Sequence, residues 1–351
     1  MALTRLSKGL VQPDLLITGF RNKLINGSFD IWQRGESLSR TSSNEDSGYH
    51  VDRFRSTLMG TMECDFTKES DDSFSDGSSY ARITVTTADT DLDSTDHMVF
   101  EQRIEGYTAR AFRDVPFSLS FWVRSSMTGT FGASVFIFNQ SSYTVPLTIN
   151  QADTWEYKKI EGIPPLSSVG ASPEYGNLQS MNCVLAFAAG TDYITSVGSQ
   201  WQAGNTSLGV DSLTNFMATA GTTIDIGEIQ LEPGNVCTPF EHRPIAFEEM
   251  LCQRYFEGPL LVSCIRHNTG SSFAGSQPIK IQLAKKRATP TYSFYTTTSR
   301  ETSGLLLNGS TVITTGFNTN ATKDYFWLWN GEAMASVGEY IDGYVDVSSE
   351  L

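Results

Sequence analysis

Regular alternation of apolar and polar residues constrains the fold of this chain more than any other feature. In the segment FSLSFWVR, Phe117, Leu119, Phe121 and Val123 share one parity, and mostly polar residues share the other. Successive side chains of a β-strand point to opposite faces, so this pattern is that of a half-buried strand. Similar segments begin at Tyr80, Met98, Phe131, Thr154, Cys183 and Thr222. The sequence therefore predicts an all-β fold, and strands at this spacing favour a β-sandwich.

The last of these segments changes parity along its length. Ile224 and Ile226 share one parity, whereas Ile229 and Leu231 share the other. One extra residue in a strand produces such a switch. We therefore expect a β-bulge near Gly227.

The pattern also predicts how the chain is divided. After Pro239, the segment PIAFEEMLCQRYF has spacing compatible with about three helical turns that begin at a proline. Beyond it, short alternating segments return, separated by Gly, Asn and Ser. The predicted parts are an N-terminal arm that docks on another protein, a β-sandwich, a short linking helix and a smaller C-terminal β domain, at residues 1–22, 23–243, 244–257 and 258–351.

The charge balance argues against two classes of partner. The chain has 25 Lys and Arg against 39 Asp and Glu, for a net charge of −14. Such a field repels phosphate backbones and anionic lipids, so nucleic acid is not an expected partner. No segment approaches 18 consecutive apolar residues, so membrane insertion is not expected either. The five cysteines include no CxxC pair and are expected to be free thiols, as in a protein that folds in a reducing cytoplasm.

Motifs for catalysis, cofactors and metals are missing from the sequence. None of the four histidines stands in an HxxxH or HxE arrangement, and no nucleophile elbow or phosphate-binding loop follows a predicted strand. The acidic segments starting at Glu69 and Thr86 do not match a calcium-binding loop, so we expect solvated loops. No enzyme activity, cofactor or metal site is predicted. Convergence of loop acids such as Asp71, Asp72, Asp91 and Asp93 into a glycosidase pair stays open as an alternative.

Binding of a sugar is the better supported chemistry. Sugar recognition needs flat aromatic faces beside polar groups, usually on loops. Tyr175, Tyr193 and Trp329 stand in or near segments of loop composition. These three residues are the predicted glycan-binding residues.

Several segments together resemble a bacteriophage tail-fibre and tail-protein family whose sandwich is a carbohydrate-binding-module-like jelly roll. The strongest match is IGEIQLEPGNVCTPFEHRPIAFEEMLCQRYF at 226–256, where Cys237 replaces the usual Ala and Phe256 a frequent Tyr. Phe54 replaces a usual Trp, and Lys286 replaces a usual Met. The other similar segments are LINGSFDIWQRG at 24–35, GYHVDRF at 48–54, 117–131, 152–164 and 279–295.

This resemblance implies a non-catalytic tail fibre or receptor-binding virion protein. Residues 1–22 would attach to other phage tail or neck proteins, and the β domains would contact host-surface polysaccharide. The resemblance also implies a homotrimer located in the virion tail and made in the cytoplasm of the host bacterium. Two alternatives are kept: a head, neck or tail decoration protein that binds only other virion proteins, and a polysaccharide-degrading tailspike.

Overall fold

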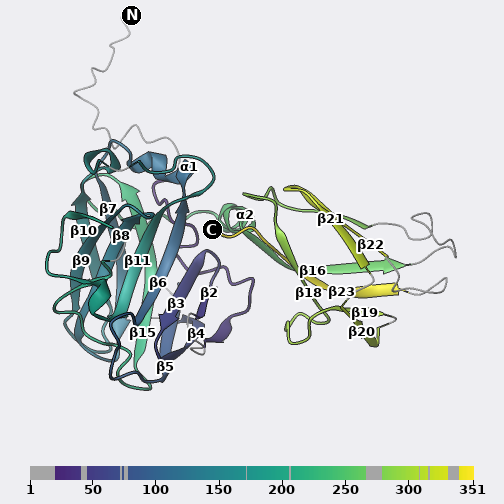
Figure 1. Ribbon diagram of the computed structural model, residues 1–351, viewed down its shortest axis with the longest axis horizontal. Coiled ribbons are helices and arrows are strands. Elements are labelled where there is room, and N and C mark those ends of the chain that lie inside the picture. Colours follow the sequence, from purple (N-terminus) through teal and green to yellow (C-terminus); the bar gives the residue numbers. More distant parts are fainter. Residues whose placement is uncertain are drawn as a thin grey trace, which may run out of the picture. The chain divides into compact units, whose positions relative to one another are not determined.

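The computed structural model describes residues 20–40, 46–71, 73–74, 78–170, 172–204, 207–265, 279–307, 309–314, 317–330 and 340–351. The chain forms two compact units (Figure 1). Unit 1 contains the residues up to Asp30, Glu36–Arg243 and Leu351; unit 2 contains Ile31–Gly35 and Pro244–Glu350. The division differs from the predicted one, because Ile31–Gly35 belong to unit 2 and not to the predicted sandwich of residues 23–243. Of the predicted arm, residues 1–19 lie outside the described residues.

Unit 1 is a β-sandwich made of two antiparallel sheets. In spatial order, the described strands of sheet 1 are β1 (Ser37–Arg40), β4 (Glu63–Ser70), β5 (Ser79–Thr87), β15 (Thr223–Pro233), β7 (Phe117–Ser125) and β10 (Glu156–Ile163). Those of sheet 2 are β13 (Trp201–Ala203), β9 (Ser141–Ile149), β8 (Gly129–Ile137), β11 (Gln179–Ala189), β6 (His97–Glu105), β3 (Phe54–Met59) and β2 (Asp46–Tyr49). Between β5 and β11 the chain passes repeatedly from one sheet to the other, as in a jelly roll. The predicted fold class is confirmed.

The core of unit 1 lies between the two sheets. The ring of Phe121 on β7 is 6.0 Å from that of Phe131 on β8, and Phe66 on β4 is 6.3 Å from Phe100 on β6, measured between centroids. All four side chains are buried. Burial of one such side chain contributes about 1.5–3 kcal/mol. The faces predicted from period-two alternation are thus the ones that pack.

The predicted bulge is present in β15. The register of β15 against β7 shifts between Gly227 and Gln230, and Glu228 has a positive φ of 46°. A β-carbon on Gly227 would lie 2.2 Å from the ring of Phe74, so this position accepts only glycine without movement. The strand then ends at Pro233, before Gly234 with φ of 133°.

Short elements connect the strands of unit 1. A small parallel pair consists of β12 (Ile194–Thr195) and β14 (Gly209–Val210). The helical turns are α1 (Gly106–Ala109), η3 (Arg110–Phe112), η4 (Leu166–Ser168) and η5 (Thr191–Tyr193).

The larger segment of unit 2, Pro244–Glu350, starts with helix α2 (Ile245–Gln253) and continues as two smaller sheets. The helix is shorter than the predicted 244–257, because Phe256 already pairs with Ser348 of the neighbouring strand. The first sheet holds β16 (Phe256–Ile265), β23 (Tyr340–Ser348), β19 (Leu305–Leu307), β20 (Thr311–Ile313) and β18 (Thr291–Tyr295), the last paired with β23. The second holds β17 (Ile279–Gln282), β22 (Tyr325–Asn330) and β21 (Phe317–Ala321). The core of unit 2 is formed by buried residues of both sheets, including Val262, Leu305, Phe326 and Ile341.

Candidate functional site

The turn between β6 and β7, which contains α1, lies at one end of the sandwich (Figure 1). It runs through α1 and η3 to Arg113, which still has helical φ and ψ. Residues three apart align on the same side of a 3₁₀ turn. Gly106, Ala109 and Phe112 are buried. Each of these residues is followed by an exposed one, namely Tyr107, Arg110 and Arg113. The Tyr107 residue is 54% exposed.

A second loop lies against this turn and brings Tyr175 to it. The backbone N–H of Gly106 donates to the Leu178 carbonyl at 2.9 Å, and that of Tyr107 donates to the Gly176 carbonyl at 2.7 Å. A β-carbon on Gly106 would lie 2.5 Å from the carbonyl oxygen of Glu174. The absence of a side chain at Gly106 therefore permits the close approach of the two backbones.

Two arginines and two tyrosines meet at this junction. Arg110 Nε donates to the Tyr175 carbonyl at 2.8 Å, and its guanidinium carbon is 5.0 Å from the centroid of the Tyr107 ring. The Arg113 guanidinium is 5.6 Å from the Tyr175 ring. Tyr175 is half-buried, and this burial raises the pKa of its phenol. We call Tyr107, Arg110, Arg113 and Tyr175 the tyrosine–arginine surface.

The chemistry of the tyrosine–arginine surface suits a polar ligand with flat apolar faces. Aromatic rings provide stacking area at a low cost in conformational entropy, and guanidinium groups provide several directed donors. Arg113 also lies 3.7 Å from Asp114, with side-chain exposures of 64% and 70%. An exposed pair of this kind is weak, so a ligand can compete with it.

Tyr193, the second predicted residue, lies elsewhere in unit 1. Its ring contacts that of His97 at 4.6 Å between centroids, in a T-shaped arrangement. His97 begins β6, whereas the turn that carries Tyr107 follows the end of β6 at Glu105. Nine residues of strand span roughly 27 Å, so Tyr193 and Tyr175 cannot share a small ligand. Tyr193 packs against a cluster formed by Val99, Phe136, Val184, Ala186 and Leu208.

Trp329, the third predicted residue, belongs to unit 2. Its backbone pairs with Asn318 between β22 and β21. Its side chain lies outside the described residues. Within unit 1, the structure therefore keeps Tyr175 and Tyr193 apart.

The acidic loops occupy separate places. Asp71 accepts hydrogen bonds from Tyr80, at the start of β5, and from Arg124, whereas Asp91 and Asp93 follow the end of β5. Asp91 and Asp93 line a cavity of about 650 Å³ together with Asp89 and Asp96. Among the described residues lining it there is no aromatic ring for a sugar to stack on. Asp72 lies outside the described residues.

Metal binding and membrane spanning have no support in the described part of the chain. There, no three His, Cys, Asp or Glu side chains converge in a way that could hold a metal ion. Within the same residues, no helix is both long and apolar enough to cross a membrane.

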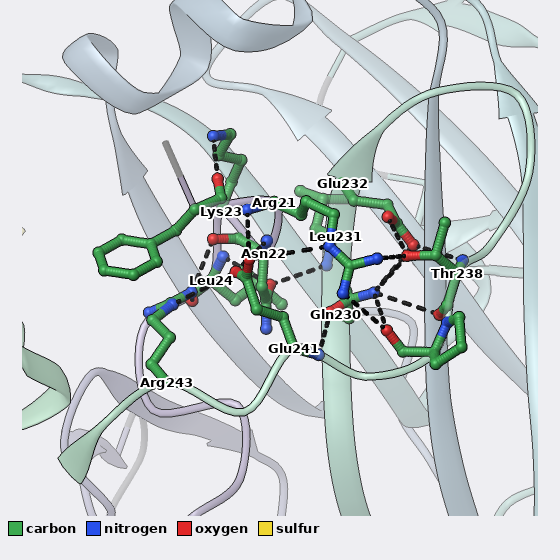
Figure 2. Close-up of polar contacts among 12 residues, drawn as sticks. Arg21, Asn22, Lys23, Leu24, Gln230, Leu231, Glu232, Thr238, Glu241 and Arg243 are labelled. Carbon is green, nitrogen blue, oxygen red and sulfur yellow. Dashed lines mark hydrogen bonds and ion pairs between the residues drawn. The ribbon is translucent and has the colours of Figure 1, made fainter. Parts of the chain in front are cut away.

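The strongest sequence motif forms a polar clamp around residues 21–24 (Figure 2). The Glu241 carboxylate accepts the backbone N–H groups of Arg21 and Asn22 at 2.9 and 3.0 Å. Arg243 Nη2 donates to the carbonyls of Asn22 and Leu24 at 2.6 and 2.7 Å. The Asn22 amide oxygen also accepts the backbone N–H of Leu231 on β15. The clamp ties the segment that follows the predicted arm to the last strand of the sandwich.

Sequence reasoning missed Tyr107, Arg110 and Arg113. A signal for them exists in GYTARAFR, where small or apolar residues at positions 106, 109 and 112 alternate with exposed ones at a period of three. This period of three stands between β6 and β7, two strands whose sequences have a period of two. No sequence signal places Tyr175 beside them, because its position depends on hydrogen bonds to a distant turn.

Comparisons with known proteins give limited information. No protein-family model matches the chain, and no curated protein matches it. Membership of the phage family that the sequence resembles therefore stays a prediction.

Similar solved structures include TmCBM61 in complex with β-1,4-galactotriose, at 10% identity and a TM-score of 0.31, covering 61% of this chain and 99% of that one. A family 11 carbohydrate-binding module from Clostridium thermocellum, in complex with a β-1,3-1,4-mixed-linked tetrasaccharide, has 11% identity and a TM-score of 0.27, covering 55% and 98%. The enzymatically active domain of bacteriophage CBA120 tailspike protein 4 has 14% identity and a TM-score of 0.32, covering 60% of this chain and 21% of that chain. TM-scores this low carry no inference about function.

Proposed function

We propose that this chain is a non-catalytic receptor-binding protein of a bacteriophage virion and that it binds host-surface glycan through the tyrosine–arginine surface. The observation that carries the glycan part is the exposed Tyr107 ring beside Arg110, Arg113 and Tyr175 at the tip of a β-sandwich. Aromatic faces stack on the C–H faces of sugars, while guanidinium N–H groups bond to sugar oxygens. Loops at the end of a rigid sandwich are a common position for such contacts.

The phage role is supported by the sequence resemblance, strongest over residues 226–256. On this proposal, residues 1–22 attach the protein to other tail or neck proteins of the virion, which is assembled in the host cytoplasm. The polar clamp is consistent with attachment, because it fixes residues 21–24 to the sandwich. A homotrimer is proposed as well, and light scattering should then give three times the chain mass.

The decisive experiment is binding of the purified full chain to polysaccharide from the host surface. We expect binding, and we expect the chain to block phage adsorption. Tyr107→Ala and Tyr175→Ala should each weaken binding about tenfold or more, since each removes a stacked ring. Tyr340→Ala removes a tyrosine that is 36% exposed in unit 2 and serves as the control.

Three other outcomes would point away from the proposal. A decoration protein would neither bind the polysaccharide nor compete with adsorption. Release of reducing sugar by the purified chain would establish a degrading enzyme. Full binding by both tyrosine variants would move the glycan contact away from the tyrosine–arginine surface.

A further inference from the structure

We propose that the tyrosine–arginine surface selects acidic glycans, and that Arg110 binds the carboxylate of a uronic acid residue. This inference rests on the proposed function and specifies the class of sugar. It concerns a surface formed by Tyr107, Arg110, Arg113 and Tyr175, in a chain whose net charge of −14 otherwise disfavours anions.

The orientation of Arg110 is the first argument. Its Nε is already used, because it donates to the Tyr175 carbonyl at 2.8 Å. Its guanidinium also lies over the Tyr107 ring, at 5.0 Å from the centroid. These two contacts fix the side chain before any ligand arrives, which lowers the entropy lost on binding. Within the described residues, the bond to the Tyr175 carbonyl is the one hydrogen bond that the Arg110 side chain makes, and the residue is exposed, so the fork formed by its two Nη atoms is available to a ligand.

The chemistry of that fork is the second argument. A guanidinium whose Nε is occupied still offers two parallel N–H donors from Nη1 and Nη2, and their geometry matches the two oxygens of a carboxylate. A neutral sugar hydroxyl has one oxygen and no charge, so it forms weaker hydrogen bonds with these donors than a carboxylate does. The neighbouring Tyr107 ring, 54% exposed, offers a face for the pyranose that carries the carboxylate.

Arg113 and Asp114 supply the third argument. Among the described residues, the Arg113 side chain is held by an exposed pair with Asp114 at 3.7 Å and by its position over the Tyr175 ring at 5.6 Å. Glu174, the other nearby acid, has its carboxylate engaged by the backbone N–H of Gly176. The carboxylate of a ligand can therefore replace Asp114 as the ion-pair partner of Arg113. The negative charge of Asp114, however, repels that carboxylate. Removing the charge of Asp114 should accordingly strengthen the binding of acidic sugars.

The cavity lined by Asp89, Asp91, Asp93 and Asp96 provides a contrast within the same unit. Its four carboxylates repel an acidic sugar, and its described lining offers no ring. The selection for anions therefore belongs to the end of the sandwich that carries α1.

The test uses the full chain and an array of matched oligosaccharides. Oligomers of galacturonate, glucuronate and mannuronate are each placed beside the carboxyl-reduced oligomer, which has the same stereochemistry without the charge. We expect the acidic member of at least one pair to bind about tenfold or more tightly than its reduced partner. Added salt should weaken only the acidic member.

Variants assign this preference to individual residues. Arg110→Gln should remove the preference, so that the acidic and the reduced oligomer of each pair bind equally, and Arg110→Lys should retain only part of it because the fork is lost. Asp114→Asn removes the charge that opposes the anion, and it should raise affinity for the acidic member alone.

The outcomes separate this inference from the proposed function. Equal binding within every pair, or a preference that survives Arg110→Gln and does not respond to Asp114→Asn, would overturn acidic selection and leave glycan binding intact. Absence of binding to every oligomer and to host polysaccharide would overturn the proposed function itself.

Discussion

At the scale of single residues, some charged groups of unit 1 act by satisfying backbone atoms. Arg243 is a clear case, because its side chain is only 3% exposed and its Nη2 serves two carbonyls of the N-terminal segment. Glu241 serves two backbone N–H groups of the same segment. The Glu241 carboxylate also lies 3.6 Å from Arg243 Nε.

Arg243→Ala is predicted to destabilise the protein by about 3 kcal/mol, because buried carbonyl and carboxylate groups lose a charged partner. Urea denaturation measures this loss. His242→Ala is the control, since that side chain is 65% exposed and should change the free energy of unfolding by less than about 0.5 kcal/mol. Equal effects of the two variants would show that the clamp does not contribute to stability.

Asp71 makes a prediction about acid stability. Hydrogen bonds from Ser73 first, and then from Tyr80 and Arg124, lower the pKa of Asp71 to about 2, against the opposing effect of burial. A carboxyl with a lowered folded-state pKa contributes stability above its unfolded pKa of about 4, and this contribution is lost as the pH falls toward 2. The stability gap between the wild type and Asp71→Asn should therefore be constant above pH 5 and narrow from there to pH 2.

Urea titrations at successive pH values measure this gap. The stability gap between the wild type and Ser73→Ala should narrow over the same pH range, but by a smaller amount. The reason is that the Ser73 hydrogen bond lowers the pKa of Asp71 more than any other contact does. A gap between wild type and Asp71→Asn that stays constant down to pH 2 would contradict the assignment.

At the scale of elements, the strands with regular alternation were predictable and the irregular ones were not. Strand β9 (Ser141–Ile149) was missed because Pro146 interrupts its pattern. A proline lacks a backbone donor, so it is expected only where one side of a strand is unpaired. Pro146 faces Gly132 of β8, and the pairing of β9 with β13 ends at Tyr143. Only the sheet order reveals that this position tolerates proline.

Gly106→Ala tests the junction between two elements. The added β-carbon would meet the Glu174 carbonyl oxygen at 2.5 Å and the Gly176 nitrogen at 2.7 Å, so the loop carrying Tyr175 must move. We expect a loss of about 1–3 kcal/mol in stability and weaker glycan binding, measured by thermal denaturation and titration. Thr108→Ala, in the same turn, should leave binding unchanged. Unaltered binding by Gly106→Ala would remove Tyr175 from the proposed site.

At the scale of the whole molecule, the chain does not divide into two units at a single point. Residues Ile31–Gly35 belong to unit 2, where Arg34 lies 3.6 Å over the Phe256 ring and Gln33 donates to the Phe256 carbonyl at 3.0 Å. Leu351 belongs to unit 1, where its carbonyl accepts hydrogen bonds from Tyr49 and Arg103. A cut of the chain at residue 243 therefore removes contacts from both units: unit 2 loses Ile31–Gly35, and unit 1 loses Leu351.

A fragment of residues 1–243 is predicted to expose Trp32. This side chain is 8% exposed in the full chain and belongs to unit 2, which the fragment lacks. Comparison of each protein with its Trp32→Phe variant isolates the fluorescence of Trp32. Its emission should shift to longer wavelength, and acrylamide quenching should increase in the fragment. Identical quenching of Trp32 in both proteins would show that the fragment is complete without unit 2.

By itself, the sequence determined the β-sandwich and the bulge near Gly227, because each follows from local rules. Period-two alternation allows one face of each strand to pack, and a parity switch requires an extra residue. Only the tertiary structure decided the candidate site. Tyr175 reaches Arg110 through backbone hydrogen bonds that a glycine permits between two distant loops. No periodicity encodes such a meeting, since it depends on how strands far apart in the sequence are ordered in space.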